Sequence, residues 1–101
     1  MRTTLLSPEY KRKITQAIGY EFDASHTYKY LSNLLMGLGY FGSAQFFKTE
    51  AIDESTHAQK WFDFVNDMQD VAELPTVSPM NFKIMTLREA FTRYYEKEYA
   101  L

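Results

Sequence analysis

Apolar residues recur at spacings of three and four along three stretches of the chain, which is the period of an α-helix. This pattern predicts one helix over residues 8–36, a second over 43–71 and a third over 87–101. Residues 7–9, Ser-Pro-Glu, form a helix start, with a capping hydroxyl, a proline at the first helical position and an early acid. No strand-like alternation covers a comparable length, so the pattern predicts an all-α fold.

The breaks in this pattern predict how the helices are connected. Three of the glycines cluster between residues 37 and 42, which indicates a turn, and Ser43 is expected to cap the second helix. Residues 72–86 contain both remaining prolines and have no period, which predicts a long connector. Thr86 and Glu89 then form a capping box. We expect residues 1–101 to form one domain, in which a hairpin of two long helices precedes a partial third helix.

One glutamate interrupts the apolar stripe of each predicted helix: Glu21, Glu54 and Glu98. The apolar members of the stripes are Ile14, Ala17, Ile18, Ala24, Tyr28, Leu31 and Leu35, then Ala44, Phe47, Ala51, Ala58, Trp61, Val65 and Met68, and finally Leu87, Phe91, Tyr94 and Leu101. Burying an ionised carboxylate without a partner is costly, and three acids facing one core repel each other. A bound cation removes both penalties because each carboxylate becomes a ligand.

His57 strengthens the prediction of a metal site. It follows Glu54 by one helical turn, so both side chains can reach the same ion. A Glu-x-x-His pair facing a bundle core, with a Glu from a neighbouring helix, is the ligand set of di-iron and di-manganese carboxylate bundles. Carboxylate and imidazole ligands suit iron or manganese, and a chain without cysteine has no thiolate site for structural zinc or copper(I).

Simpler interpretations stay open for each residue taken alone. A glutamate on a predicted stripe can lie at its edge with the carboxylate in water, and a histidine near a helix core is often only hydrogen-bonded. Glu50, one turn before Glu54, is either an accessory ligand or a surface residue. Tyr28 either packs in the core or acts near the metals as a hydrogen-bond donor and one-electron reductant.

Composition narrows the function further. Aromatic residues make up 17% of the chain, which indicates large apolar faces that seek partners. The net charge is only −2, and the basic residues 11–13 lie beside acids, so nothing suggests a nucleic-acid-binding surface. The longest apolar stretch, residues 34–41, contains two glycines and is too short to span a membrane. The first thirteen residues lack the pattern of a secretory signal, so we expect a cytoplasmic protein.

Four segments of the sequence are distinctive: AIGYEFDASHTY at residues 17–28, FFKTEAIDESTHA at 46–58, YYEKE at 94–98 and the connector from 74 to 87. Together they resemble the corresponding segments of bacterial-type non-haem ferritins.

The resemblance implies an iron site and its chemistry. Glu21, Glu54 and His57 would hold one iron, while Glu54, as a bridge, and Glu98 would hold the second, with Tyr28 as the tyrosine of the site. The implied activity is that of a ferroxidase: oxidation of Fe(II) by oxygen or peroxide, followed by storage of ferric mineral in a hollow shell. One mild departure is an aspartate at position 53, where the family usually has glutamate.

The resemblance also implies that this chain is a short or truncated form. Ferritin subunits have four long helices and a short one, whereas this chain reaches about halfway through the third. It would then be a fragment, or two copies would complete a four-helix bundle about a two-fold axis, which supplies four carboxylates and two histidines. We expect such a homo-oligomer that binds iron, with manganese as the other candidate metal. The rival hypothesis is a catalytically inactive ferritin-derived bundle that serves as an assembly module.

Overall fold

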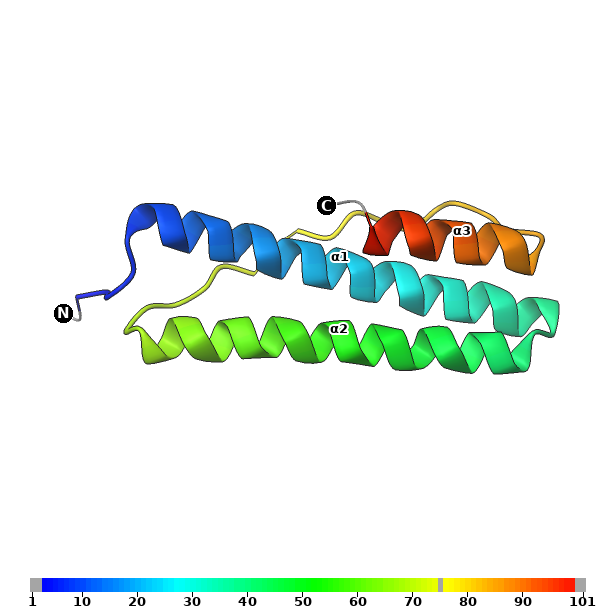
Figure 1. The fold of residues 1–101 in the computed structure, drawn as a ribbon, viewed down its shortest axis with the longest axis horizontal. Helices are drawn as coiled ribbons and strands as arrows, with labels where there is room; N and C mark the ends of the chain where they lie inside the picture. Colours follow the sequence, from blue (N-terminus) through cyan, green and yellow to red (C-terminus); the bar gives the residue numbers. More distant parts are fainter. Residues whose placement is uncertain (1–2, 75, 100–101) are drawn as a thin grey trace.

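The computed structural model describes residues 3–74 and 76–99, and every regular element in them is a helix. Helix α1 spans Pro8–Leu38, α2 spans Phe41–Asp67 and α3 spans Leu87–Glu98. Helices α1 and α2 run antiparallel side by side, and the segment after α2 returns along the hairpin to its far end, where α3 begins (Figure 1). Helix α3 then lies against α1 and runs antiparallel to it (Figure 1). The all-α prediction is confirmed.

Helix α1 begins as the sequence predicts. The Ser7 hydroxyl accepts a hydrogen bond from the backbone N–H of Tyr10 at 3.2 Å, and Pro8 occupies the first turn. The helix continues to Leu38, slightly beyond the expected end, because Gly39 is the residue that adopts the left-handed conformation, with a φ of +88°. Its N–H then bonds to the carbonyl of Met36 at 3.1 Å, which closes the last turn.

The expected start of α2 was wrong. The cap is Tyr40, not Ser43, and it makes no side-chain capping bond. Because Gly39 reverses the chain at once, the Tyr40 N–H bonds back to the Leu35 carbonyl, and the Tyr40 carbonyl already accepts from Ala44 N–H at 2.9 Å. The turn is therefore complete before Ser43 is reached.

The expected end of α2 near residue 71 was also late. The helix ends at Asp67, and Gln69 has a φ of +64°, in the left-handed region. The Asp70 N–H bonds back to the carbonyl of Val65 at 3.1 Å, which closes the helix in the manner of a Schellman cap. Without a glycine or proline there, the sequence carried no strong stop.

The capping box of α3 is confirmed. The Thr86 hydroxyl accepts from Glu89 N–H at 3.2 Å, and the Glu89 carboxylate accepts from Met85 N–H at 3.3 Å. The helix ends at Glu98 with Tyr99 as its cap. The expected continuation to residue 101 includes positions 100 and 101, which lie outside the described residues.

The core forms two clusters along the hairpin. Most of the predicted stripe residues are buried, while Ala17, Trp61, Met68, Leu87, Phe91 and Tyr94 are half-buried, and Leu101 lies outside the described residues. The cluster near the hairpin turn consists of Ala24, Tyr28, Leu31, Leu35, Ala44, Phe47, Ala51, Ile84 and Ala90. The cluster at the other end consists of Leu6, Ile14, Ile18 and Val65. Stripe positions 21 and 54 fall between these clusters, so the hairpin places two carboxylates in the middle of its interior.

Candidate metal centre

Glu21, Glu54 and His57 lie together at the middle of the hairpin, contributed by α1 and α2. The His57 Nδ1 atom is 3.4 Å from Glu21 Oε2 and 3.5 Å from Glu54 Oε2. One ligand atom from each of the three side chains lies within 4.8 Å of the others. Glu54 is buried, and Glu21 Oε2 is a buried oxygen without a hydrogen-bond partner among the described residues. A buried carboxylate oxygen in this condition needs a cation or a proton.

A second group of potential ligands shares Glu54 with the first. Glu50, Glu54 and Glu98 each offer one oxygen within 4.8 Å of the others, and Glu98 comes from α3. The Tyr28 hydroxyl donates to Glu98 Oε1 at 2.6 Å, and the Tyr94 hydroxyl lies 3.5 Å from Glu50 Oε2. The shared carboxylate makes the arrangement suitable for two ions side by side, with Glu54 between them.

Local helix geometry explains how α2 supplies three of these groups. Glu50, Glu54 and His57 follow one another at spacings of four and three, so they form one row on the helix face. Glu21 faces this row from α1. The sequence allowed two roles for Glu50, an accessory ligand or a surface residue. In the structure it is half-buried beside Glu54.

Contacts with α1 hold the last turn of α3, which carries Glu98. The Lys97 ammonium forms an ion pair with Asp23, and the Tyr20 hydroxyl donates to the Lys97 carbonyl. Neither these contacts nor the contact from Tyr94 to Glu50 could be predicted from the sequence. No periodic pattern indicates such contacts, because they depend on how α3 lies along α1.

Burial and the crowding of acidic side chains at the centre raise the pKa of several of its groups. Burial, followed by a hydrogen bond and the negative charge of Glu21, raises the pKa of Glu54 to about 7, and His57 opposes this rise. Burial, followed by the charge of Asp53, raises the pKa of Glu50. Burial and the hydrogen bond to Glu98 raise the pKa of Tyr28. The cluster therefore resists carrying all of its negative charges at once, and a bound cation would relieve that resistance.

The residues fit a hard metal ion, and the centre is open on one side. The five candidate ligands are four glutamates and one histidine, a donor set of carboxylate oxygens and imidazole nitrogen that suits iron or manganese. A depression of about 440 Å³ reaches the cluster from solvent; it is lined by Glu50, Asp53, Glu54, Thr56, His57, Lys60 and Glu98. The side chain of His57 is 51% exposed, which leaves room for an ion or a further ligand to approach.

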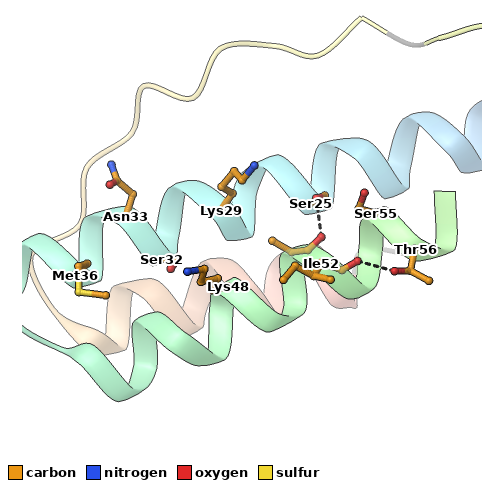
Figure 2. A pocket seen from close by; sticks show the side chains of 10 residues that line it. Ser25, Lys29, Ser32, Asn33, Met36, Lys48, Ile52, Ser55 and Thr56 are labelled. Carbon is orange, nitrogen blue, oxygen red and sulfur yellow. Dashed lines mark hydrogen bonds between the residues drawn. The ribbon is translucent and has the colours of Figure 1, made fainter. Parts of the chain in front are cut away.

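A larger groove of about 580 Å³ lies between α1 and α2 (Figure 2). Within it, the Ser25 hydroxyl donates to the Ala51 carbonyl at 2.7 Å (Figure 2), and another α1 serine, Ser32, donates to the Ala44 carbonyl at 2.7 Å. None of the candidate metal ligands lines this groove. These two serines join the helices, and the groove lies apart from the metal chemistry.

The model of the ferritin-like domain family matches residues 11–101. This chain belongs to the ferritin-like domain family. The described part of this family member contains no helix long and apolar enough to cross a membrane.

Several bacterial non-heme ferritins are similar to this ferritin-like chain. The protein of Escherichia coli O157:H7 is 28% identical over 94 residues, which cover 93% of this chain and 57% of that protein. The protein of Staphylococcus aureus strain COL is 28% identical over 87 residues, covering 86% and 52%. That of Staphylococcus epidermidis is 26% identical over the same length, with the same coverage. The chain therefore spans little more than half the length of the curated relatives it matches.

Proposed function

We propose that this ferritin-like chain binds iron at a pair of adjacent positions and oxidises Fe(II) with oxygen or peroxide before the iron is stored. The observation that carries this proposal is the pair of overlapping ligand groups that share Glu54. Iron is the substrate of this reaction. Glu21, Glu54 and His57 would hold one iron, and Glu50, Glu54 and Glu98 the other.

The side chains favour oxidation of bound iron for an electrostatic reason. Four carboxylates in one small volume stabilise Fe(III) more than Fe(II), because the higher charge gains more from each negative ligand. Tyr28, hydrogen-bonded to Glu98, is placed to give up one electron together with its phenol proton. The names of the bacterial non-heme ferritins that the chain resembles support iron over manganese as the metal.

A second copy of the chain is proposed to cover the open side of the centre. His57 is half-exposed there, and the neighbouring aromatic side chains of Trp61 and Phe62 are only partly buried. Two hairpins would bring two copies of Glu21 and two of the Glu54–His57 pair into one four-helix bundle. Native mass measurement with and without Fe(II) tests this; a stable monomer that binds less than one iron would rule the dimer out.

A cytoplasmic location stays a prediction.

Stopped-flow oxidation of Fe(II) and anaerobic Fe(II) titration test the iron site. Glu54→Ala and His57→Ala should lose saturable binding and fast oxidation, because each removes a ligand. Glu73→Ala and His26→Ala are matched controls, since both side chains are exposed and lie outside the two ligand groups. Repeating the anaerobic Fe(II) titration in the presence of competing Mn(II) distinguishes the two metals. If Glu54→Ala and His57→Ala behave like the parent chain, the alternative function, a non-catalytic assembly module, is favoured instead.

A further inference from the structure

We propose that Tyr94, Tyr95 and Tyr99 form a relay that carries single oxidising equivalents from Tyr28, beside the metal centre, to the protein surface. The proposal rests on the iron chemistry proposed above and adds an exit route to it. The four tyrosine rings follow one another at short centroid distances: 5.2 Å from Tyr28 to Tyr94, 5.7 Å from Tyr94 to Tyr95 and 5.8 Å from Tyr95 to Tyr99.

The four tyrosines lead in order from the interior to solvent. Tyr28 is fully buried and Tyr94 is half-buried, whereas Tyr95 is 55% and Tyr99 75% exposed. The last two rings are stacked, with only 21° between their planes. Helix α3 produces this row, because residues 95 and 99 are one turn apart and residue 94 faces inward beside Tyr28. The row therefore links the buried centre to an open surface in three steps.

Phenylalanine surrounds the inner part of this row. Phe46, Phe47 and Phe91 all contact the ring of Tyr94. A phenylalanine ring has no phenol proton to release and is much harder to oxidise than a tyrosine ring. A radical on Tyr94 therefore oxidises Tyr95 more readily than it oxidises any of the surrounding phenylalanines.

The inner two tyrosines also have a place to send their protons. Oxidation of a phenol to a neutral phenoxyl radical requires the loss of one electron and one proton. Glu98 Oε1 accepts the hydrogen bond of Tyr28 at 2.6 Å, and Glu50 Oε2 lies 3.5 Å from the hydroxyl of Tyr94. Tyr95 and Tyr99 release their protons to water because both are exposed.

One hydrogen peroxide molecule, formed or supplied during Fe(II) oxidation, takes one electron from Tyr28 in each of two chains. It also takes the two phenol protons, which pass through Glu98, and becomes two water molecules. Each resulting phenoxyl radical at Tyr28 regains an electron and a proton as Tyr94 becomes oxidised, and the same exchange moves the radical to Tyr95 and Tyr99. Two Tyr99 radicals on different molecules then join through their ortho carbons, and the ring protons move to the phenol oxygens to give dityrosine.

Radical mapping after aerobic addition of Fe(II) or of Fe(II) with peroxide tests the relay. A nitroso spin trap, located by mass spectrometry, should mark Tyr99, and dityrosine fluorescence should appear between molecules. In Tyr95→Phe, labelling at Tyr99 should fall at least tenfold, while the radical signal of Tyr28 and Tyr94 should last longer in freeze-quench electron paramagnetic resonance. The substitution keeps the ring on an exposed position, so the fold is retained.

Tyr10 is the internal control. It is 67% exposed, close to the value for Tyr99, but lies on the first turn of α1, about three helical turns before Glu21. Oxidants released into solution would mark Tyr10 and Tyr99 alike, whereas the relay marks Tyr99 alone. Equal labelling of the two, or labelling of Tyr99 that survives Tyr95→Phe, would overturn the proposal. Tyr10→Phe should leave the dityrosine yield unchanged.

A metal-free experiment separates this proposal from the iron chemistry on which it rests. Illuminated ruthenium tris-bipyridine with persulfate oxidises exposed tyrosines without iron. If the relay conducts, part of the resulting radical signal belongs to buried Tyr28, is lost in Tyr28→Phe and depends on Tyr95. If the radical stays on Tyr99 and Tyr10, the relay is wrong even where Fe(II) is oxidised rapidly. If it reaches Tyr28 although the chain does not oxidise Fe(II), the relay is supported and the ferroxidase proposal fails.

Discussion

The hydroxyl of Tyr28 and the carboxylate of Glu98 are joined by a hydrogen bond of 2.6 Å, although seventy positions separate them in the sequence. The bond links the buried middle of α1 to the last residue of α3. It holds the Glu98 carboxylate on the side of the centre where Glu50 and Glu54 lie. A short helix that contacts the hairpin through few residues thereby brings a candidate ligand to the centre.

Removal of this bond should lower the stability of the fold and weaken iron binding at the second position. Tyr28→Phe leaves the ring in place but deprives Glu98 of its donor, so we expect a loss of about 1–3 kcal/mol in the free energy of unfolding. Urea unfolding and anaerobic Fe(II) titration measure the two effects. Tyr30→Phe is the control, because Tyr30 packs its ring on Phe82 and its hydroxyl makes no hydrogen bond within the described residues. Equal losses in both variants would contradict this interpretation.

Unfolding of the iron-free protein should depend on pH through Glu54. Its pKa is raised to about 7 in the folded chain, first by burial and then by Glu21, from an ordinary value of 4.5. A raised pKa means that the folded state holds its proton more tightly, so the resulting stability is full below pH 4.5 and is lost as pH rises through 7. We expect a loss of about 1–2 kcal/mol between pH 5 and pH 8, because solvent at the rim screens part of the effect.

Glu54→Gln provides the test of that slope. The amide cannot titrate, so the variant should lose most of the decrease in the thermal midpoint between pH 5 and pH 8, while the parent chain keeps it. Iron binding should fail in the same variant. Glu73→Gln, an exposed position, should retain the slope of the parent chain. An unchanged slope in Glu54→Gln would show that other groups control it.

The ion pair between Lys97 and Asp23 should determine how well Glu98 reaches the second iron. In Lys97→Met, α3 loses its charged contact with α1, and we expect the second iron to bind about 10- to 100-fold more weakly while the first is retained. Anaerobic titration monitored by Mössbauer spectroscopy with ⁵⁷Fe distinguishes the two positions. Lys83→Met is the control, since Lys83 is an exposed residue of the connector. Parallel loss of both irons would indicate general unfolding instead.

A second ion pair should make the other end of the hairpin sensitive to acid. The Lys11 ammonium, 2.9 Å from Asp70 Oδ1, is the main cause that lowers the pKa of Asp70 to about 2, from 3.8. A lowered pKa contributes stability above pH 3.8 that is lost as pH falls through 2. Asp70→Asn should therefore lower the thermal midpoint slightly at pH 7 and leave it unchanged near pH 2. Asp67→Asn, an exposed neighbour, should show no such pH-dependent difference.

Periodicity predicted the elements well because it reports burial directly. Most residues of the apolar stripes of α1 and α2 are buried, and the Ser7 and Thr86 caps depend only on groups within one turn. The predicted ends of α2 were wrong, because tyrosine at position 40 and glutamine at position 69 are not residue types that mark a helix boundary. Their positions follow from backbone hydrogen bonds to Leu35 and Val65.

The sequence by itself determined that Glu21, Glu54 and His57 would face one interior, because helix period fixes which side chains share a face and two long antiparallel helices leave only one core between them. Only the tertiary structure decided that Glu50 and Glu98 belong to the same cluster, that Tyr28 reaches it through Glu98, and that Tyr94 lies between Tyr28 and the surface. These relationships depend on where α3 lies along α1. That register is fixed by contacts between residues distant in the sequence, such as Lys97 with Asp23, for which the local pattern holds no information.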